Sequence, residues 1–220
     1  MSKIERIYSY PAWEVECFDE IAGIILSASG KINIALSGGS TPIPIYKRIG
    51  AMLESLPTSK TENVRFFLVD ERNVSLESPQ SNSAMILNTI GRKFVIPFDP
   101  TEESHEDYSG KMTKALEGSN IFDLVVLGCG VDGHTASLFP NTPLLEEKSS
   151  SFLRNELLSD ELRYTMTFPL INKAKRRVVF INDQPEKIKY FSPNSLNEQA
   201  FPIHQVLSTP NTKVILHEAV

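Results

Sequence analysis

The chain of 220 residues is 41% hydrophobic and 22% charged with a formal net charge of −5, values typical of a globular protein in water. It contains no apolar run near the ~20 residues of a membrane helix, and its opening, MSKIERIYSY, has no signal-peptide core. We therefore expect a single domain over residues 1–220, located in the cytoplasm and without a membrane partner.

Helix and strand patterns alternate along the first half of the chain. In chain order they predict a helix over 13–27, a strand over 31–36, a helix over 42–56, a buried strand over 64–69 and a helix over 81–90. Thr41 is the expected N-cap of the second helix, with Pro42 at its first position.

The second half continues the alternation. Its patterns predict a polar loop over 97–110, a helix over 111–116, strands over 121–127 and 162–168, a short helix over 169–174, a strand over 177–181, a helix over 185–191 and a last strand over 213–216. Strands that alternate with helices indicate parallel βαβ units. We therefore expect an α/β fold with a doubly wound, mostly parallel sheet and helices on both faces, and a small lobe within 141–170.

Three of the expected strands end in polar segments. These are Ser37–Thr41, Asp70–Arg72 and Gly128–His134. In open α/β sheets, ligands bind beyond the carboxyl ends of the strands. The sequence therefore predicts that these turns, far apart in the chain, form one cleft.

The most informative stretch runs from Gly128 to Pro140 and reads GCGVDGHTASLFP. Glycines let the backbone approach a ligand closely, and an acid with an imidazole can do proton chemistry on that ligand. Asp132 and His134 are therefore candidate catalytic residues. In the alternative interpretation, Asp132 caps a following helix and His134 is an ordinary surface histidine.

A second candidate is a cradle between a strand and a helix. It consists of Ser37, Gly38, Gly39, Ser40 and Thr41. Successive N–H groups around glycines form anion-binding nests, the helix behind them adds its positive end, and the hydroxyls add donors. This construction suits a phosphate, although it matches neither the Walker A nor the dinucleotide pattern. The alternative is a tight, well-capped turn.

Charged side chains add further candidates. Arg72 can form a fork of hydrogen bonds to a phosphate or carboxylate, and Asp70 can accept hydrogen bonds from sugar hydroxyls. The alternative for both is an exposed charge cluster. Locally, nothing distinguishes Arg163 or Lys187 from ordinary surface residues.

The cysteines and the basic residues argue against other classes of function. Cys17 and Cys129 are far apart in sequence and fit a reducing cytosol, and Cys129 is expected to be a packed thiol. No zinc-type Cys/His spacing occurs, so no metal is expected. The densest positive cluster, Lys173–Arg177, is interpreted as a solvated helix end, and we expect no nucleic-acid partner.

Taken together, these segments resemble the 6-phosphogluconolactonase family from about residue 8 to the C-terminus. The matching pieces are Leu36–Pro42, Val69–Val74, Ser81–Asn82, Gly128–Pro140, Arg163–Thr167 and Leu170–Asn172. The piece around Asp-Gly-His is highly specific, whereas Gly-Gly-Ser-Thr-Pro also occurs in glucosamine-6-phosphate deaminases.

The resemblance implies a Rossmann-like fold and hydrolysis of 6-phosphoglucono-1,5-lactone to 6-phosphogluconate, a step of the oxidative pentose phosphate pathway, without a cofactor. It implies His134 as the general base, with Asp132 either orienting the imidazole or holding a substrate hydroxyl. The phosphate would lie on Ser37–Thr41. The other substrate-binding residues expected on this basis are Asp70, Arg72, Gly130, Arg163 and Lys187. The expected partner is a sugar-phosphate lactone, and the expected state is a monomer or a small homo-oligomer.

Two alternatives stay open. A glucosamine-6-phosphate deaminase has a glutamate five residues after the histidine, where this chain has Phe139. A non-catalytic sugar-phosphate sensor would have no need for His134. The chain also departs from the family at Gln184–Lys187, which lacks the glycine of the usual Gly-x-x-Lys turn.

Overall fold

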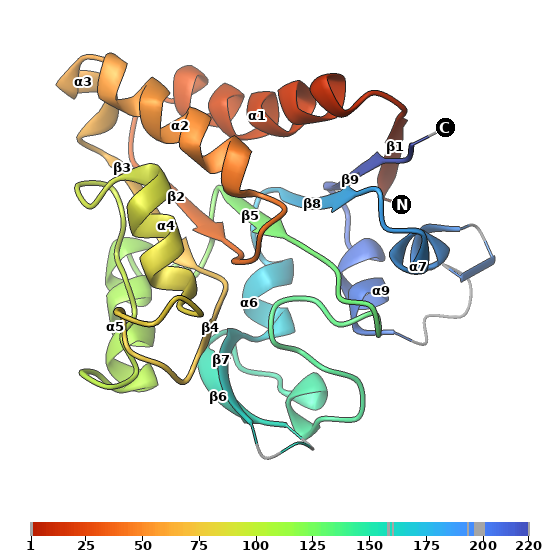
Figure 1. Ribbon diagram of the computed structural model, residues 1–220. Helices are drawn as coiled ribbons and strands as arrows, with labels where there is room; N and C mark the ends of the chain where they lie inside the picture. Colours follow the sequence, from red (N-terminus) through yellow and green to blue (C-terminus); the bar gives the residue numbers. More distant parts are fainter. Residues whose placement is uncertain (1, 158, 160, 193, 196–200, 220) are drawn as a thin grey trace.

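The structure is a computed structural model that describes residues 2–157, 159, 161–192, 194–195 and 201–219. A six-stranded sheet forms its centre, in the order β1-β9-β8-β5-β2-β3, with every neighbouring pair parallel (Figure 1). The strands are β1 (Lys3–Ile7), β2 (Ile32–Leu36), β3 (Val64–Leu68), β5 (Leu124–Leu127), β8 (Arg177–Asn182) and β9 (Thr212–His217). The predicted α/β fold with a parallel sheet is confirmed.

Helices cover both faces of this sheet. The helices α1 and α2 lie on one face, with α4 packed against α2, whereas α6 and α9 lie on the other face (Figure 1). The α-helices are α1 (Tyr10–Ser27), α2 (Ile43–Ser55), α3 (Thr58–Thr61), α4 (Asn82–Ile90), α5 (His105–Ala115), α6 (Phe168–Asn172), α7 (Pro185–Ile188) and α9 (Pro202–Leu207), and the short 3₁₀ turns are η1 (Pro143–Glu146) and η2 (Lys189–Phe191). No helix among the described residues is both long and apolar enough to span a bilayer.

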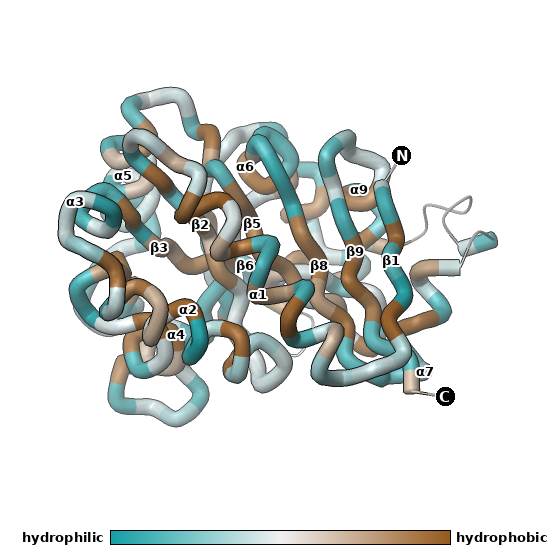
Figure 2. Tube along the Cα trace, turned by 90° about the horizontal axis from the view of Figure 1, so that it is seen from above, coloured by the Kyte–Doolittle hydropathy of each residue, from teal (hydrophilic) through white to brown (hydrophobic). Residues whose placement is uncertain are grey.

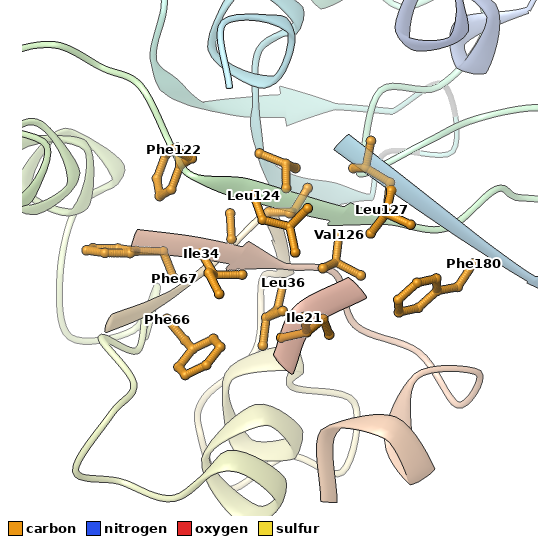
Figure 3. Close-up of a cluster of buried hydrophobic side chains, with 14 of the residues drawn as sticks. Ile21, Ile34, Leu36, Phe66, Phe67, Phe122, Leu124, Val126, Leu127 and Phe180 are labelled. Carbon is orange, nitrogen blue, oxygen red and sulfur yellow. The ribbon is translucent and has the colours of Figure 1, made fainter. Parts of the chain in front are cut away.

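The core follows from strands that are buried on both faces. All five residues of β2 and all four of β5 are buried, which explains their nearly continuous apolar sequences. The middle of the sheet is accordingly hydrophobic in Figure 2, and Figure 3 shows Ile34, Leu36 and Val126 packed between the two helical layers. The indole N–H of Trp13 on α1 donates to the carbonyl of Ile215 at 3.0 Å, so the first helix is also tied to the sheet by a buried hydrogen bond.

The strand order creates a switch point between β2 and β5. The chain runs from β2 through α2 to β3 on one side, whereas β8 and β9, which follow β5 in this sheet, lie on the other side. At such a point the connections diverge and leave a crevice at the carboxyl ends of the strands. The segments that follow β2 and β5 begin at Ser37 and Gly128, and Ser37 N–H donates to Val126 O at 3.1 Å.

A second, three-stranded sheet lies below the first in Figure 1. It consists of β4 (Asp70–Arg72), β7 (Leu162–Met166) and β6 (Phe152–Glu156), and both pairings are antiparallel. The prediction that Asp70–Arg72 is a turn is therefore wrong. After a bend at Val69, this polar segment pairs with β7, and Val69 O accepts a hydrogen bond from Met166 N at 2.8 Å.

Several elements were not predicted. They are β1, β6, α3 and α9, together with the first two turns of α5, which fall in the expected loop over 97–110. The start of α5 is capped by Ser104, whose hydroxyl accepts from Asp107 N at 3.1 Å. The predicted cap at Thr41 is also wrong, because α2 begins at Ile43 with Pro42 at its N-cap.

The interpretation of Lys173–Arg177 as a solvated cluster is wrong for Arg177. This side chain is 2% exposed, and its guanidinium donates to the carbonyls of Asn172 and Ala174 at the end of α6 and to Thr212 Oγ1. A helix end attracts cations because its last carbonyls are unpaired. Arg177 uses that attraction inside the core, where it joins α6 to β9.

Two helical glycines make a matched test of the packing. A Cβ at Gly50 of α2 would lie 2.2 Å from the Thr89 carbonyl of α4, whereas a Cβ at Gly23 of α1 meets nothing within 4 Å. We expect Gly50→Ala to destabilise the protein by about 1–3 kcal/mol, because backbone must move. Gly23→Ala should stabilise it by about 0.5–1 kcal/mol. Thermal unfolding of both variants measures the difference, and equal melting temperatures would contradict the close contact of α2 with α4.

Candidate active site

The three predicted polar segments do meet. They line one cavity of about 310 Å³ at the carboxyl ends of β2 and β5. Of the predicted site residues, the lining includes Ser37, Gly38, Gly39, Ser40, Thr41, Asp70, Arg72, Gly130, His134 and Lys187. It lacks Arg163 and Asp132. The expected cleft is therefore confirmed as a place where these segments come together.

The cradle after β2 offers unused backbone donors. The N–H groups of the four residues from Gly38 to Thr41 have no hydrogen-bond acceptor within the part of the chain that the structure describes. Gly39 has φ +93°, a left-handed conformation that other residues rarely adopt. The cradle is held from below by Tyr46, whose buried hydroxyl donates to Ser37 O at 3.0 Å. Four free donors beside the start of α2 suit an anion.

His134 lines the same cavity as the cradle. Its ring lies directly over Gly130, where a Cβ would come within 2.1 Å of the imidazole Cε1. On its other side the ring stacks on Phe139, with centroids 4.1 Å apart and planes at 29°. Any side chain at position 130 would displace the ring, so this glycine is needed for close approach.

Asp132 fixes which imidazole nitrogen is available. Its Oδ1 lies 2.5 Å from His134 Nδ1 and also accepts from the His134 backbone N–H at 3.2 Å. Burial raises the pKa of Asp132, but these hydrogen bonds and the nearby imidazole outweigh it, so that its pKa lies below the ordinary value. An ionised Asp132 requires a proton on Nδ1, which leaves Nε2 as the free base. The alternative that Asp132 caps a helix is wrong, because no helix follows it.

Asp70 is a buried carboxyl at the floor of the cavity. Burial raises its pKa above the ordinary value, opposed by a hydrogen bond from Ser137 Oγ at 2.7 Å and by the charges of Arg72, His134 and Arg163. The folded protein therefore holds a carboxyl for which the ionised form is costly. Such groups are concentrated at functional sites.

The three predicted cations occupy different positions. Arg72 lines the cavity, and its Nη1 donates to Gln80 O at 2.7 Å and to Asn82 Oδ1 at 2.8 Å. Lys187 lines the cavity from α7. Arg163 is paired in register with Arg72, but its guanidinium bonds Glu161 at 2.6 Å. The structure thus brings two of the three cations to the cavity wall.

Two site features were not predicted. Asn82 lines the cavity although only 2% exposed, and Glu71, fully buried, accepts hydrogen bonds from three backbone N–H groups and one hydroxyl. The cap pattern at Ser81 could have located Asn82 at a helix start, but not beside the cradle.

Cys129 is buried, as predicted for a packed thiol, and burial raises its pKa to about 12. No group of three or more potential metal ligands clusters anywhere in the described ranges.

Comparisons with known proteins agree with this architecture. A family model described as "Glucosamine-6-phosphate isomerases/6-phosphogluconolactonase" matches residues 15–215. The chain is 33% identical over 225 residues to a "Probable 6-phosphogluconolactonase" of Dictyostelium discoideum, covering 94% of each protein. It is 33% identical over 187 residues to the "6-phosphogluconolactonase" of Chlamydia pneumoniae, covering 80% of this chain and 71% of the relative.

Solved structures show the same fold. A 6-phosphogluconolactonase from Shewanella baltica superposes with a TM-score of 0.80 at 23% identity, covering 100% of this chain and 98% of the other. The one from Thermotoga maritima has a TM-score of 0.77 at 25% identity and complete coverage of both chains.

Fold and cavity define an α/β protein with a cavity at the switch point of a parallel sheet, the place where open α/β sheets bind ligands. Within that class, the chain belongs to the glucosamine-6-phosphate isomerase/6-phosphogluconolactonase family.

The raised pKa of Asp70 predicts how stability depends on pH. Ionisation of Asp70 lowers the free energy of unfolding, so Asp70→Asn should raise Tm at pH 8 relative to the wild type. The difference should vanish below about pH 4, where an unfolded aspartate is protonated. It should grow as pH rises and level off above the folded-state pKa. Each kcal/mol corresponds to about 2–4 °C in a chain of this size. Unfolding scans from pH 4 to 8 measure it, and a lower Tm of the variant at pH 8 would contradict the cost.

Proposed function

We propose that this chain hydrolyses 6-phospho-D-glucono-1,5-lactone to 6-phosphogluconate, the reaction named for its relatives. One observation carries the proposal. A histidine with Nδ1 engaged by a carboxylate faces the same cavity as four unused backbone N–H donors. The first suits a base that activates water, and the second suits a phosphate.

The reaction needs one proton carrier. His134 Nε2 removes a proton from water as the oxygen attacks the lactone carbonyl carbon, and a tetrahedral oxyanion forms. When the intermediate collapses, the bond from that carbon to the ring oxygen breaks, and the imidazolium returns its proton to the departing oxygen. Asp132 stabilises the imidazolium and keeps Nδ1 protonated throughout. A lactone is reactive enough that no covalent enzyme intermediate is required.

The phosphate anchors the other end of the substrate. It carries about −1.5 to −2 charge at pH 7, which the N–H groups of Gly38–Thr41 and the guanidinium of Arg72 would bind. We propose Lys187 and Arg163 as further cations on the same side, the latter after release from Glu161. Holding the remote phosphate positions the carbonyl for attack.

The environment of the imidazole bears on the other activity of the family. Ring opening of an amino sugar in the deaminase branch uses a glutamate five residues after the histidine. Here Phe139 holds that position and stacks on His134 at 4.1 Å. An aromatic ring carries no proton, which supports the lactonase assignment over the deaminase one.

We further propose that residues 1–220 act as a single domain, with a small lobe within 141–170, in the cytoplasm and as a monomer or small homo-oligomer. The pairing of β4 with β7 supports the single domain, because it joins the lobe to the segment that follows β3. Two free, buried cysteines support a reducing compartment.

His134→Ala should lower kcat by roughly 10² or more, since general-base assistance is typically worth 10²–10⁴. The measurement is a coupled assay in which glucose-6-phosphate dehydrogenase generates fresh lactone, with the spontaneous hydrolysis subtracted. His105→Ala is the matched control, because His105 lies at the start of α5, away from the cavity. Wild-type turnover in the His134 variant would remove this residue from the mechanism.

Arg72→Ala should mainly raise KM. Loss of a charge-assisted hydrogen bond costs about 1.5–3 kcal/mol, which corresponds to roughly 10- to 100-fold in KM with kcat changed little. Arg154→Ala, which removes a surface ion pair with Glu156, is the control. A kcat effect without a change in KM would contradict a phosphate contact.

A further inference from the structure

We propose that Asn82 is a positioning residue that aims Arg72 at the phosphate end of the cavity and fixes the edge of the cradle. This inference rests on the proposed function, because it assumes that a phosphate occupies the cradle. Asn82 transfers no proton in the proposed reaction. Its side chain would affect substrate binding through its contacts with Arg72 and Gly38.

The Asn82 amide uses both of its ends. Its Oδ1 accepts from Arg72 Nη1 at 2.8 Å, and its Nδ2 donates to Asp70 O at 2.9 Å. The amide therefore joins the backbone of β4 to a side chain of the same strand. Only Nη1 of the guanidinium is engaged, by Asn82 and Gln80, so that Nε and Nη2 remain without an acceptor among the described residues. Those donors are the ones available to an anion.

The same amide lies against the cradle. A Cβ at Gly38 would lie 1.8 Å from Asn82 Oδ1 and 2.1 Å from Asn82 Cγ. The glycine is thus required by the asparagine side chain that packs against it. Because Asn82 is 2% exposed, it cannot move aside into solvent.

Glu71 holds Asn82 in place. Its carboxylate accepts from the backbone N–H groups of Asn82 at 2.8 Å and Ser83 at 2.7 Å, and from Arg72 N at 2.7 Å. The first two donors belong to the start of α4, where backbone N–H groups lack partners within the helix and where a carboxylate also interacts favourably with the helix dipole. One buried carboxyl group therefore fixes the helix start that carries Asn82 and the strand residue that Asn82 orients.

This arrangement makes a prediction that separates positioning from packing. We expect Asn82→Ala to raise KM for the lactone about tenfold and to leave kcat within about threefold, because Arg72 loses its orientation but keeps its charge. Asn82→Asp should raise KM further. Its carboxylate would pair with Arg72, repel the phosphate and face the Asp70 carbonyl without a donor.

The relative KM values of the two variants distinguish positioning from packing. If Asn82 only fills space, the isosteric Asp variant will raise KM less than the Ala variant does, and that result would overturn the proposal. Unchanged KM in both variants would do the same. Ser83→Ala is the matched control on the same helical turn, since its hydroxyl bonds Phe98 O in the core. It should lower Tm without a change in KM.

A double-mutant cycle tests the contact with the cradle. Gly38→Ala should raise KM strongly in the wild-type background, and should add much less to Asn82→Ala, because the clashing amide is gone. Additive effects would refute the coupling.

Calorimetric measurement of 6-phosphogluconate binding to the wild type and to each variant separates a failure of the proposed function from a failure of the role of Asn82. A wild-type protein that neither hydrolyses the lactone nor binds this product would refute the proposed function. An active wild type with unaffected Asn82 variants would refute only the role of Asn82.

Discussion

The parallel pairing of β2 with β5 is the constraint on which the cavity depends. The register aligns Leu36 with Val126, and the ladder extends one residue further through the hydrogen bond from Ser37 N–H to Val126 O. Beyond that hydrogen bond both segments leave the sheet. The segment after β2 enters the cradle, and the segment after β5 enters the turn that carries His134. Because both strands are buried on both faces, a slip in register would set every side chain against neighbours that it does not fit. The spacing between the two walls is therefore set by packing.

The polar parts of the site are held by groups that are themselves buried. Glu71, Asp70 and Asn82 sit on or beside β4, where water cannot replace a lost partner. Glu71 and Asn82 each make several hydrogen bonds, which offset the cost of their burial, whereas the Asp70 carboxyl has one, from Ser137. Arg72 is thus oriented by a network of buried groups that would be costly to break.

The sequence predicted those parts of the site whose structure is determined by residues adjacent in the chain, and not those that depend on contacts between distant segments. The cradle and the Gly128–His134 turn follow apolar strands directly, so that a pattern of neighbouring residues revealed both. The local sequence of β4 predicts a turn, because the strand character of this short polar segment arises from its pairing with β7, far along the chain. Asn82 belongs to a piece that matches the family, but its place beside the cradle was not predicted, since its contact with Gly38 exists only in the folded protein. Arg177 resembled its exposed neighbours for the same reason, because the carbonyls that bind it are brought together by folding.

Charge is distributed unevenly within the cavity, and in the proposed reaction this distribution would orient the substrate and favour release of the product. The chain as a whole carries −5, yet the cradle presents free N–H groups with Arg72, whereas His134, elsewhere in the lining, is hydrogen-bonded to the ionised Asp132, which does not itself line the cavity. A lactone is neutral at its reacting end and carries its charge on the phosphate, so it fits this polarity in one orientation. In the proposed reaction, hydrolysis would create a carboxylate beside His134. Across the imidazole, Asp132 would repel this new charge, so that the carboxylate that orients the base would also favour departure of the product.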